Sequence, residues 1–225
     1  MTRTHTRLID YHRLEASGRS SVLVVKLMMA CNDMQLANEA ASNWKDDQPR
    51  SKQYRQAGAR MYFNRLQMAH LHEALKIIEE LRKDEQLMAL LSICDSQTQS
   101  SFRKLKSYLK GGENRTLVEK IIGQVRHNLT FHYDETGKWI ARAISEIAAI
   151  PGGHHAHVVR GSNAYLWHFE AGDEIMDKII VRYIWQIPQD KNLREEADAI
   201  SDQMHDIFLT FMDFSGEFIW RYSER

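Results

Sequence analysis

The sequence contains few of the residues that interrupt regular secondary structure. Only three prolines and eleven glycines occur in its 225 residues, and this scarcity argues against a loop-rich or all-β chain, which needs frequent turn residues. The two cysteines, Cys31 and Cys94, show no metal-ligand spacing, so a reduced pair is expected rather than a disulfide framework. The longest uncharged apolar runs, such as residues 22–25, are far too short to span a bilayer.

Neither sign of charge prevails in the chain. Thirty basic and thirty acidic residues cancel, so the field of the whole protein steers no polyanion, and any contact with nucleic acid must come from a local patch. The composition, with 43% hydrophobic and 27% charged residues, is typical of a globular protein. The chain is also long enough to bury a core. Residues 1–5 include no apolar signal segment, so we expect a cytoplasmic location rather than export.

Apolar residues recur at helical spacing along most of the chain. In the last stretch, Ile200, Met204, Ile207, Phe211 and Phe218 fall on one face, and this aromatic-rich face must meet other helices or a second subunit. The periodicity predicts helices over residues 20–47, 54–92, 98–110, 138–150, 174–188 and 193–222, with a further helix that begins at Asn114 or Thr116.

Polar residues and glycines indicate where these helices begin and end. Ser20 or Ser21 is the expected N-cap of the first long helix, because a serine hydroxyl can accept from the unpaired amides of the first turn. The second long helix should kink near Lys83, and a turn is expected at Asp95. The glycine pair at 111–112 should end the helix that precedes it.

Residues 154–170 break the helical pattern and predict either a β-hairpin or an irregular loop. The predicted fold is therefore mainly α: an antiparallel bundle of about six or seven helices in one domain, with a small hairpin near residues 156–169. Within that domain, residues 1–17 form an N-terminal arm, residues 18–150 form the bundle, and residues 151–225 form an extension with two helices packed on it.

One stretch, residues 125–134, concentrates groups that can bind a phosphate or move a proton. A metal-free RNA-cleaving site needs a base for the ribose 2′-OH, a cation for the scissile phosphate and a frame that holds both. His132 can be the base, because an imidazole is partly neutral near pH 7. Arg126 can bind two phosphate oxygens at once, and its guanidinium stays charged because it does not lose its proton in proteins. The supporting groups are His127, Asn128 and Tyr133.

The spacing of the two principal groups needs a break in the helix or a second subunit. Arg126 and His132 are six positions apart, which on a straight α-helix leaves them about 120° apart around the axis. They can meet if the helix ends or bends near Leu129 and Thr130, which the turn-like residues 133–137 favour. They can also meet across a two-fold axis, where each subunit gives the same helix end to a shared cleft. A homodimer is therefore expected.

This order of Arg126, a polar residue and His132 resembles the R-x(4–6)-H motif of the HEPN family of all-helical proteins, many of which are ribonucleases. The resemblance covers residues 55–150 in architecture. It implies a cleft between paired helices, holding the Arg and His of both protomers, that cleaves RNA without a metal or other cofactor and typically leaves a 2′,3′-cyclic phosphate. Family members favour Asn, Asp or His directly after the Arg, and His127 fits. Many members are toxins or phage-defence effectors, which would allow an inhibitory partner protein, and others have lost activity.

Basic residues outnumber acidic ones immediately before the motif. Such a strip can bind an RNA backbone through phosphate contacts and counterion release, or it can merely solvate one helix face. The candidate RNA-binding residues are Arg103, Lys104, Lys106, Lys110, Arg115 and Lys120.

Three other interpretations remain open at this stage. Arg126 could simply interact with the helix dipole as a C-terminal cation, in a non-catalytic helical module that binds RNA or a partner protein. The chain could also be a metal-dependent bundle enzyme, because imidazoles and carboxylates occur close together at residues 70–73 and 202–205. A third imidazole cluster, residues 154–157, follows two glycines and could ligate a transition metal or lie in an exposed loop.

Overall fold

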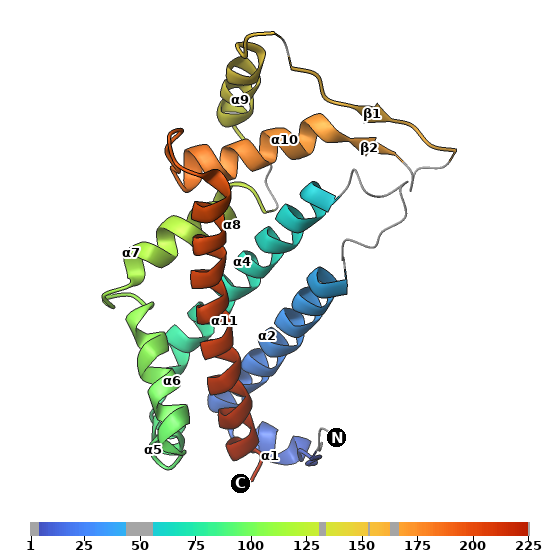
Figure 1. Cartoon of the computed structure of the whole chain (residues 1–225). Coiled ribbons are helices and arrows are strands. Elements are labelled where there is room, and N and C mark those ends of the chain that lie inside the picture. Colours follow the sequence, from blue (N-terminus) through green and yellow to red (C-terminus); the bar gives the residue numbers. More distant parts are fainter. Residues whose placement is uncertain (1–4, 44–55, 131–133, 153, 163–166, 225) are drawn as a thin grey trace. The chain divides into compact units, whose positions relative to one another are not determined.

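The structure is a computed structural model that describes residues 5–43, 56–130, 134–152, 154–162 and 167–224. The chain is mainly α-helical, with one small antiparallel sheet (Figure 1). The predicted fold class is therefore confirmed. Among the described helices, none is long and apolar enough to cross a membrane.

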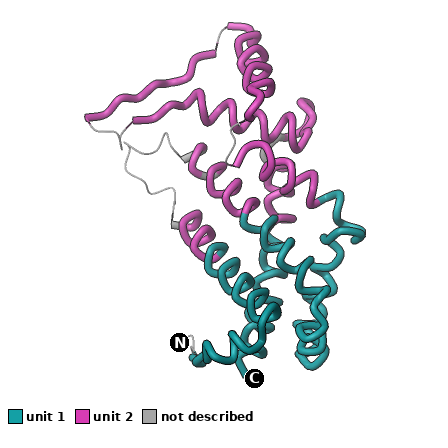
Figure 2. Tube along the Cα trace, turned by 180° about the vertical axis from the view of Figure 1, so that it is seen from behind, with its two compact units in different colours: residues 1–34, 70–117, 205–225 teal, residues 35–69, 118–204 magenta. Residues whose placement is uncertain are grey.

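The chain folds into two compact units (Figure 2). Unit 1 consists of residues 1–34, 70–117 and 205–225, and unit 2 of residues 35–69 and 118–204. Each unit thus combines segments that are distant in the sequence. Three long helices contribute residues to both units: α2 (Gly18–Asn43), α4 (Gln56–Leu81) and α11 (Leu193–Tyr222).

Unit 1 has an aromatic core. The second half of α11 contributes three fully buried phenylalanines, and the ring centroid of one of them, Phe214, lies 5.2 Å from that of Phe102 and 5.2 Å from that of Phe218. The predicted apolar face of the last helix is therefore core rather than free surface, although the prediction had left out Phe214. The shorter helices of this unit are α1 (Tyr11–Ala16), α5 (Glu85–Ser92) and α6 (Ser96–Ser107).

Aspartates are the N-caps of α1, α5 and α6 in unit 1. The carboxylate of Asp84 accepts from the Leu87 amide at 3.0 Å and begins α5, so the predicted kink near residue 83 is a complete break between α4 and α5. The prediction that Ser20 or Ser21 caps α2 is wrong, because α2 begins at Gly18. Both serines lie inside the first turn of the helix, and the buried Ser20 hydroxyl donates to the Asp84 carboxylate at 2.8 Å.

Asp84 therefore holds two helices together as well as capping one, and we expect Asp84→Ala to be strongly destabilising. The substitution removes a cap and leaves the Ser20 hydroxyl with only a long contact to Gln86, at 3.3 Å. The expected loss in the free energy of unfolding is about 2–3 kcal/mol, measurable by chemical denaturation. Asp95→Ala is the matched control, since Asp95 caps α6 through the Thr98 amide at 2.7 Å from an exposed position. Equal losses in the two variants would contradict the bridging role of Asp84.

The turn after α6 requires glycine at two positions. Gly111 has a left-handed backbone, with φ of 84°, and a Cβ atom at Gly112 would lie 2.2 Å from the carbonyl oxygen of Ser107. The prediction that the glycine pair ends this helix is wrong, because α6 ends at Ser107 with Tyr108 as its C-cap, and the glycines shape the turn that follows.

Unit 2 contains two π-helical segments, Glu119–Gly123 and Ile179–Ile184. The second covers a β-branched run that is awkward for an α-helix, because such side chains crowd the preceding turn. The Trp185 indole at its end donates to the carbonyl of Ile121, at 3.3 Å, and so joins the two segments. The first segment leads directly into α8 (Gln124–Asn128), which carries the first part of the predicted motif.

The rest of unit 2 consists of two helices and the hairpin. α9 (Lys138–Ala148) lies against α10 (Glu170–Lys178), and Glu146 of α9 forms an ion pair with Lys178 at 3.2 Å. Strand β1 (Val158–Val159) pairs antiparallel with β2 (His168–Phe169), so the predicted hairpin is confirmed. α10 begins immediately after β2, so the hairpin and the helix are directly connected in the chain.

Candidate functional site

The helix that carries the motif ends between Arg126 and His132, as the six-residue separation of these two residues requires. α8 stops at Asn128, and Leu129 leaves helical geometry with φ of −128°. Past this point the chain turns back, since the Asp134 amide donates to the Asn128 carbonyl at 2.9 Å. The predicted break near Leu129 and Thr130 is therefore confirmed.

A cation from another helix binds the carbonyl at this helix end. The guanidinium of Arg65, on α4, donates to the Leu129 carbonyl at 3.1 Å. Carbonyls at a helix C-terminus lack partners within the helix and carry partial negative charge. The role of C-terminal cation at Leu129 is thus taken by Arg65, a residue 64 positions away in the sequence.

The three described motif residues occupy the last turn of α8. Arg126 is half-buried, His127 is exposed and Asn128 is half-buried, with its amide nitrogen donating to the Gln124 carbonyl at 2.8 Å. Successive residues point about 100° apart around a helix axis, so these three side chains leave the helix in different directions. The other two candidates, His132 and Tyr133, lie outside the described residues.

His127 and Asn128 line a pocket of about 370 Å³. The opposite wall is the turn that leads into α9, and it adds an ammonium and an indole to the pocket. This volume lies at the lower end of the range for small-molecule sites. The lining residues are His127, Asn128, Asp134, Glu135, Thr136, Lys138 and Trp139. Arg126 is not among them.

The amides at the start of α9 are already used within this pocket. One carboxylate oxygen of Asp134 accepts from the amides of Trp139 and Ile140, at 2.8 and 3.2 Å, and the other accepts from the Thr136 hydroxyl at 3.1 Å. Asp134 holds the left-handed backbone, with φ of 55°, that this turn needs. A bound phosphate would therefore have to be held by side chains, of which His127 and Lys138 are the cationic or protonatable ones. Sequence reasoning missed Lys138 and Trp139, since only the turn brings them opposite α8.

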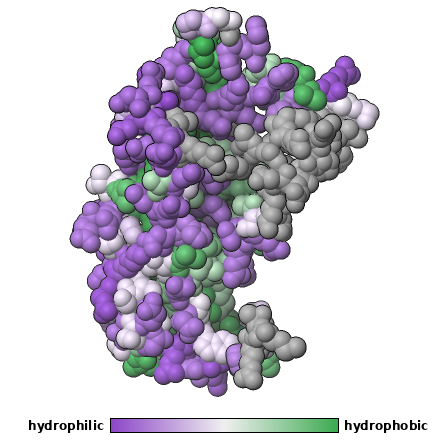
Figure 3. Space-filling model, in the orientation of Figure 1, coloured by the Kyte–Doolittle hydropathy of each residue, from purple (hydrophilic) through white to green (hydrophobic). Residues whose placement is uncertain are grey.

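The candidate RNA-binding residues divide between the two units. Five of them belong to unit 1 and Lys120 belongs to unit 2. Arg103, Lys104, Lys106 and Lys110 are exposed, Arg115 is half-buried, and Lys120 is exposed. The ammonium of Lys104 lies 2.7 Å from the Asp206 carboxylate, so its charge is partly compensated within unit 1. Figure 3 shows a mostly hydrophilic surface on the face in view, with apolar residues in separate patches.

The residues of the metal-site interpretation point in different directions. His70 and His72 are two positions apart on α4, and so lie on opposite sides of the helix; His70 is half-exposed and His72 is buried. The Nδ1 atom of His70 lies 4.0 Å from an Asp33 oxygen. His205 is exposed, and its ring stacks on Phe208 with centroids 5.8 Å apart.

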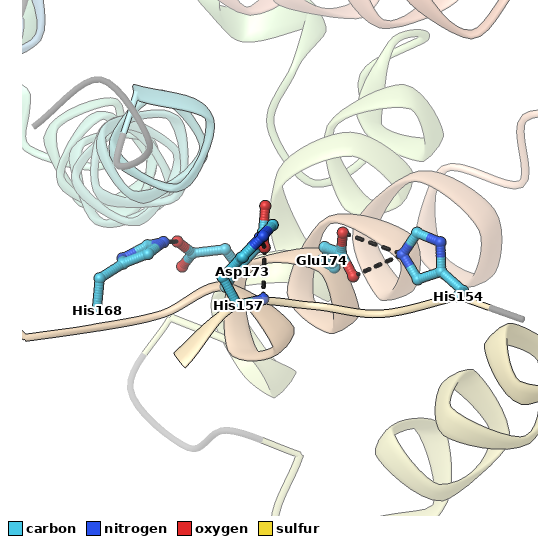
Figure 4. Close-up of polar contacts among 6 residues, drawn as sticks. His154, His157, His168, Asp173 and Glu174 are labelled. Atoms are coloured by element: carbon cyan, nitrogen blue, oxygen red, sulfur yellow. Dashed lines mark hydrogen bonds and ion pairs between the residues drawn. The ribbon is translucent and has the colours of Figure 1, made fainter. Parts of the chain in front are cut away.

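A second concentration of ionisable groups joins the hairpin to α10 (Figure 4). Three imidazole–carboxylate pairs connect the two elements: His154 with Glu174 at 3.1 Å, His157 with Glu170 at 2.6 Å, and His168 with Asp173 at 3.7 Å. The backbone amide of His157, and then its ring, lower the pKa of Glu170. The histidine cluster noted in the sequence is thus partly used to hold the hairpin on the helix. The signal that could have shown this is the acidic series Glu170, Asp173, Glu174 and Asp177 at helical spacing.

One residue of this series, Asp177, is half-buried, and one oxygen of its carboxyl is shielded from solvent. Burial, and next the charge of Asp173, raise the pKa of Asp177 to about 7, against an opposing effect of the Arg65 guanidinium. Its Oδ1 atom is buried and accepts no hydrogen bond from the part of the chain that the structure describes. Asp173 itself lies against the first turn of α4, where a Cβ atom on Gly58 would collide with its carboxylate.

Unit 1 contains a larger pocket, of about 480 Å³, beside α1. Its lining is mostly aliphatic and small polar, with Arg13 and Asp10 as charged members and no imidazole among the lining residues described. The buried thiol of Cys31 in the same unit has its pKa raised to about 11 by burial, so it is not a nucleophile at neutral pH. The groups near α8 are therefore better candidates for proton transfer than this pocket or Cys31.

Comparison with protein-family models, with curated proteins and with solved structures finds no match for this chain. Its function has to be argued from the geometry and chemistry of the site.

Proposed function

We propose that the protein is a HEPN-like, metal-independent endoribonuclease whose site lies at the end of α8. In this proposal His132 is the general base or acid and Arg126 stabilises the charge that builds on the scissile phosphate. His127 and Asn128 position the substrate from the pocket, with Tyr133 as a further supporting group. The runner-up is a non-catalytic helical module that binds RNA through the same residues.

The observation that carries the proposal is the pocket beside the motif. Two of the three described motif residues, His127 and Asn128, line a ligand-sized pocket directly after the helix ends. The pocket also offers Trp139, on which a base can stack, and Lys138, which can contact a phosphate. An imidazole, an amide, an indole and an ammonium lie around one hollow together with the carboxylates of Asp134 and Glu135, and this polar lining suits a ribonucleotide better than an apolar ligand.

The proposal includes a homodimer. Arg126 does not line the pocket of its own α8, and a two-fold axis would let the same helix end of a second copy supply the missing cation. Dimerisation and activity should then be lost together on dilution.

The test is cleavage of labelled RNA by the purified wild-type protein in the presence of EDTA. We expect endonucleolytic products that carry 2′,3′-cyclic phosphates, identified by mass spectrometry. A metal-dependent bundle enzyme would instead lose its activity in EDTA. Intact RNA over a broad substrate panel, despite measurable RNA binding, would favour the non-catalytic module and refute the proposal.

A further inference from the structure

The hairpin of unit 2 has two different faces. The register pairs Val158 with Phe169 and Val159 with His168, and successive residues of a strand point to opposite sides. His168 and Val159 therefore share the inner face, where His168 is only 8% exposed. Val158 and Phe169 share the outer face, with exposed fractions of 74% and 56%.

Continuing this register by one pair adds Arg160 and Trp167 to the outer face. The Arg160 guanidinium lies 5.5 Å from the centroid of the Trp167 ring, as expected for cross-strand neighbours. The Trp167 and Phe169 rings are edge-to-face, with centroids 6.5 Å apart. We call Val158, Arg160, Trp167 and Phe169 the outer hairpin face; all four residues are exposed.

Contacts with α10 and within the hairpin orient this exposed aromatic face. The imidazole–carboxylate pairs of His154, His157 and His168 join the inner side and the edge of the hairpin to α10 (Figure 4). The indole nitrogen of Trp167 donates to the Gly161 carbonyl at 3.1 Å, which fixes the orientation of that ring. Trp167 and Phe169 are 41% and 56% exposed, so part of each ring is accessible to a ligand.

We propose that the outer hairpin face is a stacking platform for the unpaired bases of single-stranded RNA, taking RNA as the ligand from the proposed function. Bases stack on aromatic rings and on arginine planes regardless of their identity. The charge of Arg160 favours this occupant over an apolar protein surface, because among the described residues its guanidinium lies over an aromatic ring and forms no ion pair with a carboxylate. A phosphate next to a stacked base would supply the missing negative charge.

The test separates binding from cleavage by using an uncleavable probe. A 12-nucleotide single-stranded DNA has no 2′-OH for transesterification but keeps the bases and phosphates that the platform recognises. Its affinity for the full-length protein is measured by fluorescence anisotropy, beside the RNA of the same sequence and a blunt DNA duplex. We expect similar binding of both single strands and much weaker binding of the duplex, whose bases are already stacked.

Substitutions on the outer hairpin face measure how much each residue contributes to single-strand binding. Trp167→Ala and Phe169→Ala should each weaken single-strand binding by about five- to a hundredfold, while Trp167→Phe should retain most of it. Arg160→Ala should reduce the slope of log K against log salt concentration by about 0.7. Tyr11→Ala is the control, since Tyr11 is an aromatic residue of unit 1 that is 83% exposed.

Each outcome separates this inference from the proposed function. Unchanged affinity in both Trp167→Ala and Phe169→Ala, or equal affinity for the duplex, would overturn the platform even if the wild-type protein cleaves RNA. Loss of a dimer in Trp167→Ala with unchanged DNA affinity would assign the face to self-association and would also overturn it. Weaker binding in both alanine variants supports the platform, even if the wild-type protein cleaves no RNA and the proposed function fails.

Discussion

Replacing His132 or Arg126 by alanine should lower the rate of RNA cleavage by about 10²–10⁴-fold while the protein stays folded. His132 would no longer take the proton from the ribose 2′-OH, and Arg126 would no longer stabilise the charge that develops on the phosphate. Both effects fall on the transition state, so kcat should drop more than KM rises. The measurement is single-turnover cleavage of a labelled RNA in EDTA, with circular dichroism to confirm the helical content of each variant.

Matched substitutions make this result specific. His12→Ala and Arg19→Ala remove the same side chains from exposed positions on α1 and α2, and should leave cleavage unchanged. Arg126→Lys keeps the charge but loses the bidentate contact with phosphate, so its cleavage rate should lie between those of Arg126→Ala and the wild type. His127→Ala should reduce cleavage less than His132→Ala, because His127 lines the pocket as a positioning residue in the proposal. Full cleavage by both His132→Ala and Arg126→Ala would rule out these roles.

Asp177→Asn should stabilise the protein at pH 8 by about 2–4 kcal/mol. Burial raises the pKa of the Asp177 carboxyl from its ordinary value of 3.8 to about 7 in the folded state. The folded protein therefore holds a proton that the unfolded chain releases between these two values. Stability falls as pH rises through this window and changes no further, through Asp177, once pH exceeds the folded pKa.

The charged and titratable groups around Asp177 decide the direction of this effect. Asp173 and Glu174, on the same helix, oppose its ionisation, and Arg65 of α4 favours it. One guanidinium that also binds the Leu129 carbonyl does not compensate for burial and two nearby carboxylates. An asparagine has nearly the same shape and carries no charge at any pH, so it removes the penalty without opening a cavity.

Thermal unfolding at several pH values tests this prediction. The midpoint difference between Asp177→Asn and wild type should be near zero at pH 4 and on the order of 5–10 °C at pH 8. Asp190→Asn, at an exposed position, should show no such divergence. Parallel curves for wild type and Asp177→Asn from pH 4 to pH 8 would show that Asp177 ionises normally in the folded protein.

Local signals in the sequence predicted the elements of this protein well. Apolar periodicity predicted the long helices and Asp95 indicated a turn, whereas the glycine pair at 111–112 lies in the turn beyond the end of α6 and does not cap it. The serine cap failed because α2 begins at Gly18, which places Ser20 and Ser21 inside its first turn. There the Ser20 hydroxyl donates to Asp84, which caps α5, and the Ser21 hydroxyl donates to the Gly18 carbonyl. The contact between Ser20 and Asp84 joins residues far apart in the sequence, and periodicity does not reveal it.

The candidate site was only partly predictable. The motif and the break after α8 follow from neighbouring residues, because a helix end depends on its own last turn. The opposite wall of the pocket, Lys138 and Trp139, follows from how the chain turns back at Asp134. The pairing of the hairpin histidines with the carboxylates of α10 likewise needed the helix and the hairpin to be placed side by side.

By itself the sequence determined the helical class, the position of most helices and the concentration in residues 125–134 of groups that can bind a phosphate, and it left residues 154–170 as either a hairpin or a loop. These properties depend on spacing and capping within a few residues, where backbone geometry leaves little choice. The tertiary structure alone decided that Arg65 binds the end of α8, that Asp177 is half-buried beside other carboxylates, and that Trp167 and Phe169 face solvent. The reason is physical: burial and electrostatic pairing depend on which distant segments pack together, and many packings satisfy the same local pattern.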